Sequence, residues 1–428
     1  MKPRTLAVPL ATALMLAVTA CTGTNNTDTG SEPSADGEGV TLRYLVEQLE
    51  DAAAEDRLRS RLDEFESANP RITVELDTMP FDTMRTVLQT QLRSGDAPDV
   101  ISWGSGPSFG GALAEAGLLY DLTDAYEEYG WEVYDFARER VTQDGMVYGI
   151  PGEMETLGIF YNAEVFDELG IEEPQDLADL EAAAETVRQA DLVPLAVSDQ
   201  EGWQGGHLLS IALSSSIGSE GMQELIDGER SWNSPEVVGA LELWERWQQA
   251  GYLPPSPTSI SYDSGNALFY SGDAAMIPTG SWLADGITQN TDFEVGYIPF
   301  PAPDGPGIFS AGLGSGPMIT AETEHPDAAL KLLDFLASPE HGRWMVENLT
   351  VIPPFPADTE GVDISPLFEE VLADAEAFGS GQGDFGLNID VLTTPAFNEV
   401  MFNGMQAILS DQATADEVAQ QLQDAAQG

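Results

Sequence analysis

The feature that most constrains the fold is an alternation of short β-rich runs with helical segments that begins at residue 40. The predicted strands span 40–46, 72–76 and 99–103, and the predicted helices span 51–67, 81–93 and 110–116. Asn69-Pro70 ends the first helix, because the residue before a proline disfavours helical backbone angles. This alternation predicts an α/β fold with a mostly parallel sheet covered by helices.

In such sheets, ligands bind at the carboxyl ends of the strands, in the loops that lead into helices. The loops at 47–51 and 104–110 are therefore the first candidate binding segments. The later sequence continues with predicted helices at 165–169, 177–189, 207–214, 221–225, 235–250, 328–337 and 413–426, and strands at 274–278 and 293–298. A globular part of about 400 residues exceeds what one hydrophobic core organises, so we expect two domains.

Composition excludes some partners. The chain has 73 acidic against 16 basic residues, which gives a formal net charge of −57. This field repels nucleic acid and anionic lipid headgroups, so neither is expected as a partner. The three histidines are far apart in sequence and the chain has one cysteine, so nothing has the spacing of a zinc site. We expect no metal and no cofactor.

The N-terminus has the pattern of an export signal. Lys2 and Arg4 precede an apolar run at 6–20, and the only cysteine, Cys21, follows directly. Residues 18–21 resemble the lipobox of bacterial lipoproteins, which implies cleavage after residue 20 and lipidation of Cys21. Residues 21–39 are then a flexible tether, and the protein is anchored by lipid at the outer face of the cell membrane. The alternative is a secreted protein whose cysteine lies near the cleavage site by chance.

Several phrases occur in a characteristic order along the chain, among them LRSGDAPDVISWGSG, FYSGDAAMIPTGSW and GYIPFPAPDG. Through them, residues 40–427 resemble the extracellular solute-binding proteins of ABC transporters, in the carbohydrate-binding family that includes maltodextrin-binding proteins. The resemblance implies a non-enzymatic, two-lobed α/β protein with a hinge. One lobe would comprise 40–158 plus 308–355 and the other 162–305 plus 360–428, with hinge segments at 156–162 and near Gly307. A sugar, expected to be an oligosaccharide, would bind between the lobes of a monomer that delivers it to membrane permease subunits.

Sugar recognition requires flat aromatic surfaces for the C–H face of a pyranose and polar groups for its hydroxyls. Trp103 ends a predicted strand, Trp203 follows a polar loop, and Trp282 follows the strand at 274–278. The resemblance implies that each lines the sugar site. For Trp103 the pattern fits core packing equally well. Trp244 and Trp247 lie three residues apart on a predicted helix and are expected to pack in a core.

Two of the polar candidates come from the same resemblance. Glu155 and Glu201 match carboxylates that contact sugar hydroxyls in similar proteins, although solvated surface acids fit the pattern too. Glu47 and Gln48 are candidates because they follow the first predicted strand. Gly312 and Gly314 are candidates for backbone contact with the ligand, or for a simple turn. The segment 394–398 lacks a tryptophan that the maltodextrin binder carries, which argues against a long α-glucan.

Other functions fit parts of the sequence. Residues 106–110 match G-x-S-x-G between a strand and a helix, so an α/β-hydrolase would use Ser108 with His325 or His341. A sugar-binding lectin without a transporter is an alternative with the same fold. A polyamine ligand would use the many acids together with aromatic walls.

Overall fold

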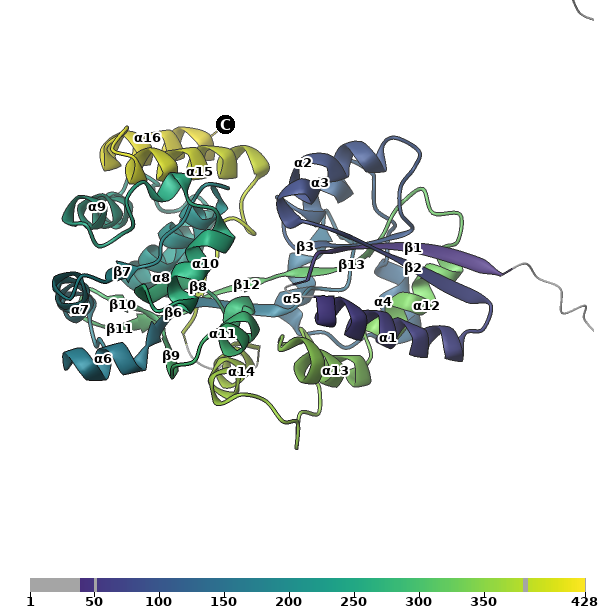
Figure 1. Ribbon diagram of the computed structural model, residues 1–428. Helices are drawn as coiled ribbons and strands as arrows, with labels where there is room; N and C mark the ends of the chain where they lie inside the picture. The colour runs from purple at the N-terminus through teal and green to yellow at the C-terminus, as the bar shows by residue number, and fades with distance from the viewer. Residues whose placement is uncertain (1–38, 50–51, 380–383, 428) are drawn as a thin grey trace, which may run out of the picture. The chain divides into compact units, whose positions relative to one another are not determined.

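A computed structural model describes residues 39–49, 52–379 and 384–427 (Figure 1). All three ranges belong to one compact unit, Gly39–Gly428. The predicted signal segment, Cys21 and the tether up to residue 38 lie outside the described residues. Within the described ranges, no helix combines the length and the apolar character needed to cross a membrane.

The first sheet has the strand order β13-β3-β1-β2. Its strands are β1 (Val40–Glu47), β2 (Ile72–Met79), β3 (Val100–Gly104) and β13 (Ser315–Ile319). Strands β1, β2 and β3 run parallel, whereas β13 arrives from much later in the sequence and pairs antiparallel with β3. The parallel part confirms the alternation predicted from the sequence.

Helices cover both faces of the first sheet. They are α1 (Ala52–Ala68), α2 (Phe81–Leu92), α3 (Gly110–Glu115), α4 (Thr123–Tyr129), α5 (Asp135–Arg140), α12 (Pro326–Leu336) and α13 (Pro339–Leu349). Figure 1 shows α2 and α3 on one side and α1 and α12 on the other. Leu58, Leu62 and Phe65, spaced four and three residues apart on α1, form an apolar stripe that is buried in the core of this sheet. A small hairpin, β4 (Thr142–Gln143) and β5 (Met146–Val147), follows α5.

The second sheet is mixed, with the order β14-β12-β6-β8-β7 and β9 paired to β6. Its strands are β6 (Met154–Asn162), β7 (Val193–Leu195), β8 (Ala274–Gly280), β9 (Val295–Ile298), β12 (Ser310–Leu313) and β14 (Gly386–Leu387). Strand β6 is antiparallel to all its partners. Its side chains alternate between two cores, with Leu157 and Ile159 in one and Met154 and Phe160 in the other.

The helices of the second part follow the predicted positions and add several. They are α6 (Ala163–Leu169), α7 (Leu177–Gln189), α8 (Trp203–Ile226), α9 (Pro235–Ala250), α10 (Tyr262–Tyr270), α11 (Ala284–Asn290), α14 (Pro366–Gly379), α15 (Pro395–Leu409) and α16 (Ala415–Ala426). Short 3₁₀ turns, η1 (Pro257–Ser259) and η2 (Ser281–Leu283), and a hairpin of β10 (Phe300–Ala302) and β11 (Gly305–Ile308) complete this part. The two helices predicted at 207–214 and 221–225 belong to α8, which is broken at Gly218 (φ 70°).

The chain passes between the two sheets at closely spaced points. Only Gly314 separates β12 of the second sheet from β13 of the first. Nearby, Ile150 donates its N–H to Pro317 of the first sheet, and β6 of the second sheet begins a few residues later. The segment 156–162, expected as hinge material, lies inside β6, and Gly307 lies in β11. The lobe boundaries themselves stay a prediction.

One buried carboxylate near the start of α8 has an unusual environment. Asp199 is 0 % exposed and accepts the N–H of Gly205 on Oδ1 at 2.9 Å. Its Oδ2 is buried and has no hydrogen-bond partner among the described residues. Burial raises the pKa of Asp199 to about 8, because the charged form loses its hydration. The folded protein therefore retains a proton here that the unfolded chain releases at acidic pH.

This environment predicts a pH dependence of stability. The Asp199 contribution to the free energy of unfolding is greatest below pH 4 and declines as pH rises to about 8, since ionisation is unfavourable only in the folded state. Asp199→Asn does not titrate and should remove this decline. Melting temperatures measured between pH 4 and 9 should therefore fall less steeply for the variant than for wild type. Asp304→Asn, at an exposed turn, is the control. Parallel profiles for wild type and Asp199→Asn would contradict the assignment.

The tryptophans of α9 pack in a core, as the sequence predicts. Trp244 is 0 % exposed, and its indole N–H donates to the carbonyl of Leu208 at 3.0 Å. Trp244→Ala should lower the free energy of unfolding by about 3–5 kcal/mol, because it removes a large buried ring and leaves a cavity. Urea unfolding measures this loss. Val87→Ala, on an exposed position of α2, should change it by less than about 0.5 kcal/mol. A comparable small loss for Trp244→Ala would show that this core tolerates the cavity.

Candidate functional site

Aromatic side chains from distant segments form one cluster, which we call the aromatic cluster: Phe81, Trp103, Trp203, Tyr262 and Trp282. Trp203 begins α8, Tyr262 begins α10, and Trp282 lies in η2 directly after β8. The ring of Trp203 lies 4.9 Å from that of Tyr262 and 6.5 Å from that of Trp282, measured between centroids. The indole N–H of Trp282 donates to the Tyr262 hydroxyl at 2.7 Å, which fixes the two rings relative to each other.

The first sheet contributes to the same cluster through Phe81 at the start of α2. The Phe81 ring lies 5.6 Å from Trp103 and 6.4 Å from Trp203, edge-on to the latter. The structure thus connects all three tryptophans predicted from the sequence. Trp103 is only 6 % exposed and also packs in the core of the first sheet. It therefore has the core-packing role that its sequence pattern allowed, in addition to its contact with Phe81. Trp203 and Trp282 are partly buried.

The backbone at Gly280 allows Trp282 to take its position. A Cβ atom at residue 280 would lie 1.8 Å from Cζ3 of the Trp282 ring. Any side chain there would therefore displace the indole. Residue 280, the last of β8, must therefore be glycine for the ring of Trp282, two residues later, to lie against the backbone at the end of the strand.

Two carboxylates lie beside the aromatic cluster. Glu153 and Glu155, two residues apart in extended chain, point to the same side, and both line a small pocket together with Trp282. A Cβ at Gly314 would lie 2.4 Å from Oε1 of Glu153 and 2.5 Å from Oε1 of Glu155, so the two carboxylates approach each other closely. Gly312, the strand partner of Glu155, has its missing Cβ 3.5 Å from Oε2 of that residue. Gly314 thus leaves room for the two carboxylates, whereas a Cβ at Gly312 would be in ordinary van der Waals contact with Glu155.

These carboxylates resist ionisation. Burial raises the pKa of Glu155 well above its usual range, and the charges of Glu153, Asp390 and Glu47 raise it further. Burial also raises the pKa of Glu153 to about 7. At neutral pH, the Glu153–Glu155 pair therefore retains at least one proton. A protonated carboxyl donates a hydrogen bond and an ionised one accepts, so the pair offers both roles to a polar ligand.

A histidine joins the carboxylates to the aromatic rings. His207 Nε2 lies 3.4 Å from Oδ2 of Asp390 and 3.3 Å from Nδ2 of Asn388. The His207 ring lies 5.1 Å from that of Trp203 and 5.5 Å from that of Trp282. Asp390 is 4 % exposed, and its Oδ1 has no hydrogen-bond partner among the described residues. The site is therefore a continuous surface of rings and carboxylates.

The remaining predicted residues differ in their support. Glu201 accepts the N–H of Tyr262 at 3.1 Å, so it holds the start of α10 next to the aromatic cluster. Glu47 lies close enough to Glu155 to influence its charge. Gln48 is exposed at the end of β1, where its N–H donates to the carbonyl of Met79 at 2.9 Å. Ligand contact by any of these residues stays a prediction.

Sequence reasoning missed several residues of the site: Phe81, Glu153, His207, Tyr262 and Asp390. Two of them had a local signal. His207 is four residues after Trp203 and so shares a face of the same helix, and Glu153 alternates with Glu155. Tyr262 and Asp390 carry no such signal, because their positions depend on pairing between segments far apart in the chain.

The hydrolase alternative fails on geometry. Ser108 donates its hydroxyl hydrogen to the backbone carbonyl of Asp390 at 2.6 Å rather than to a histidine. His341 is buried beside Arg61, and burial together with that guanidinium lowers its pKa to about 3. His325 precedes α12 as its N-terminal capping position. Among the described residues, no group of three or more His, Cys, Asp or Glu is placed to hold a metal ion.

Comparisons with known proteins give the family. The family model described as bacterial extracellular solute-binding protein matches residues 43–343. The multiple sugar-binding protein of Streptococcus mutans is 28 % identical over 313 residues, covering 70 % of this chain and 71 % of its own. The maltodextrin-binding protein MdxE of Bacillus subtilis is 26 % identical over 360 residues, covering 81 % and 79 %.

A solved structure shows the same fold. A protein from work on xylan utilisation by the thermophilic bacterium Caldanaerobius polysaccharolyticus superposes with a TM-score of 0.80 at 20 % identity, covering 90 % of this chain and 99 % of its own. These findings confirm the α/β fold of periplasmic sugar-binding proteins and the expectation that the chain is no enzyme. The chain belongs to the bacterial extracellular solute-binding protein family.

Proposed function

We propose that this protein is the saccharide-binding component of an ABC importer and that it holds its ligand at the aromatic cluster. The observation that carries the proposal is the convergence of Trp103, Trp203 and Trp282, from three distant segments, beside the carboxylates of Glu153 and Glu155. The names of the sugar-binding relatives support the same ligand class. The ligand is expected to be an oligosaccharide.

The chemistry of this surface suits a pyranose. An indole face covers the C–H face of a sugar ring and removes it from water, while carboxyl groups bind hydroxyls more strongly than water does. Trp282 is held in place by Tyr262, so little side-chain freedom is lost when a sugar stacks on it. Glu155, with its raised pKa, can donate a hydrogen bond to a sugar oxygen, and an ionised neighbour can accept one.

Ligand entry requires a change in the site. Phe81 contacts Trp203 directly, so a sugar ring fits between them only when the two aromatic groups separate. We propose that the lobes at 40–158 plus 308–355 and 162–305 plus 360–428 move apart to admit the ligand. The chain crosses between the two sheets at Gly314 and at residues 151–153, each time as a single segment. We propose that these two crossings act as the hinge.

A thermal-shift screen tests the ligand class. The folded part, residues 39–428, would be screened against maltotriose, raffinose, xylotriose and diacetylchitobiose, with spermidine as the polyamine arm. A ligand at one hundred times its dissociation constant stabilises by about 2.7 kcal/mol. Stabilisation by a saccharide supports the proposal. Stabilisation by spermidine alone would contradict it and would identify the ligand as a polyamine.

Replacing the stacking rings should weaken binding of the saccharide found in that screen. We expect Trp282→Ala and Trp203→Ala each to cost about 2–4 kcal/mol of binding free energy, or about thirty- to thousandfold in affinity, as for central desolvated aromatic residues. Calorimetric titration measures the affinity. The control is Trp232→Ala, a core tryptophan that packs on Phe397 and should lower the melting temperature while affinity changes little. Unchanged affinity in both Trp282→Ala and Trp203→Ala would remove the aromatic cluster as the ligand site.

We also propose that the protein is retained at the outer face of the cell membrane by lipid on Cys21. The support is the apolar run at 6–20 followed directly by the only cysteine. Cys21→Ala should release the protein from the membrane fraction into the medium or periplasm, as seen by immunoblotting of fractions. Export itself should continue, since the apolar segment is intact. Retention of Cys21→Ala in the membrane to the wild-type extent would point to a different anchor.

A further inference from the structure

The loop that carries the G-x-S-x-G sequence, residues 104–110, joins the part of the protein built on the first sheet to the part built on the second. We call it the latch loop, and the two parts the first and second part. The hydroxyl of Ser108 donates to the carbonyl of Asp390, three residues after β14, at 2.6 Å. A Cβ atom at Gly106 would lie 1.8 Å from the carbonyl oxygen of Val391. The backbones of the two parts therefore touch at Gly106.

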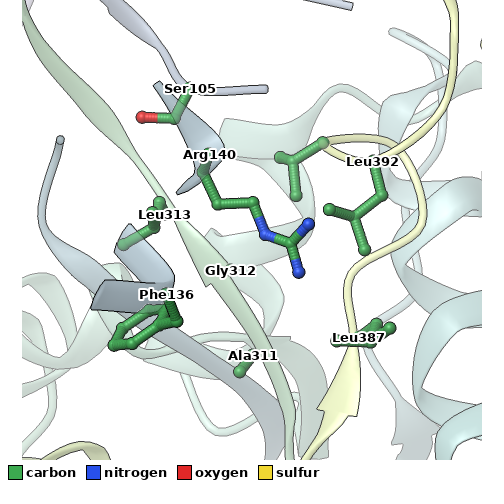
Figure 2. A pocket seen from close by; sticks show the side chains of 9 residues that line it. Ser105, Phe136, Arg140, Ala311, Gly312, Leu313, Leu387 and Leu392 are labelled. Atoms are coloured by element: carbon green, nitrogen blue, oxygen red, sulfur yellow. The ribbon is translucent and has the colours of Figure 1, made fainter. Parts of the chain in front are cut away.

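Little space is left beside this contact. The pocket in Figure 2 has Ser105 and Arg140 of the first part among its lining residues, together with Leu387 and Leu392 of the second part. Its volume of about 20 Å³ holds about one water molecule. The latch loop thus closes onto the segment after β14 without room for a ligand between them.

The latch loop is held in shape by its own part of the protein. The N–H of Gly106 donates to the carbonyl of Arg140 at 3.0 Å and to the hydroxyl of Tyr148 at 3.1 Å. The carbonyl of Gly106 accepts the N–H groups of Phe109 at 3.2 Å and Gly111 at 2.9 Å. These four bonds lie within the first part, so they persist when the two parts separate.

The contact can be broken without leaving a buried polar group unsatisfied. The carbonyl of Asp390 accepts a second hydrogen bond at 2.6 Å, from the side-chain amide of Asn398 on α15. When the two parts separate, this carbonyl keeps the bond from Asn398, and the hydroxyl of Ser108 is hydrated instead. Opening therefore avoids the large penalty of an unpaired buried acceptor.

A second contact between the two parts lies on α2. The guanidinium of Arg85 lies 5.4 Å from the ring centroid of Phe402 on α15 and 5.9 Å from that of Phe81 on its own helix, so it is attracted to both rings. Charge opposes this attraction at the next position. Burial raises the pKa of Asp82, Arg85 lowers it, and the charge of Asp263 on α10 raises it. Because attraction and repulsion oppose each other here, the latch loop can decide between closed and open arrangements.

The latch loop also contacts a residue of the proposed ligand site. The carboxylate of Asp390 lies 3.4 Å from Nε2 of His207, whose ring lies next to those of Trp203 and Trp282. We propose that the latch loop holds the two parts closed in the ligand-free protein and so sets how often the site opens. This inference rests on the opening motion proposed above for ligand entry.

Distances between two spin labels on ligand-free protein test this inference. Residues 39–428 contain no cysteine, so Gln89→Cys on α2 and Asn403→Cys on α15 place one label on an exposed position of each part. We expect a short distance to predominate in the labelled protein with no further change. Gly106→Ala should make a longer distance predominate, because the added Cβ cannot approach the backbone of Val391.

Two further variants separate docking from other effects. Ser108→Ala removes one hydrogen bond and should raise the ratio of the longer to the shorter distance by about two- to tenfold. Gly95→Ala is the matched control, because residue 95 has φ 80° against 94° at residue 106 but has open space around the added Cβ among the described residues. It carries similar backbone strain without the clash and should keep the wild-type distances.

Three results would overturn the proposal. They are a longer distance that already predominates in wild type, wild-type distances in both Gly106→Ala and Ser108→Ala, and an equal shift in Gly95→Ala and Gly106→Ala. Should Gly106→Ala fail to fold, the distances of Ser108→Ala decide alone. Because no ligand is added, these results are independent of the saccharide screen, whose failure would remove the proposed function but not the latch loop.

Discussion

The pairing of β6 along both of its edges is the constraint on which the rest of the site depends. On one edge, Leu157 pairs with Gly280, the residue that leaves room for the ring of Trp282. On the other edge, Glu155 pairs with Gly312, and two residues further the chain leaves the second sheet at Gly314. One strand therefore sets the distance between the stacking ring and the carboxylates. A shift of its register by one residue would turn Glu155 to the opposite face.

Charge is the second constraint. With a net charge of −57, the chain repels itself, and acids placed close together add to that cost. The Glu153–Glu155 pair nevertheless lies against backbone at Gly314, and its raised pKa values reflect the loss of hydration. Such an arrangement is unfavourable for folding alone. It becomes useful when a ligand with many hydroxyls supplies hydrogen bonds to both the protonated and the ionised forms.

Local patterns predicted much of the fold. The helix predicted at 51–67 is α1, at Ala52–Ala68, and the helix predicted at 235–250 has the same bounds as α9. The second sheet was harder, because the antiparallel placement of β6 between β8 and β12 joins segments more than one hundred residues apart. The tryptophans of the site were predictable through a family resemblance. Tyr262 and Asp390 were not, since only tertiary contacts bring them to the cluster.

A crystal structure of the protein with a saccharide that binds in solution would show whether the ligand lies against the aromatic cluster and the neighbouring carboxylates. We expect a pyranose ring in van der Waals contact with the face of Trp282 or Trp203, and a sugar hydroxyl within hydrogen-bond distance of Glu155. A saccharide bound elsewhere, with these three side chains still packed only against protein, would contradict this expectation.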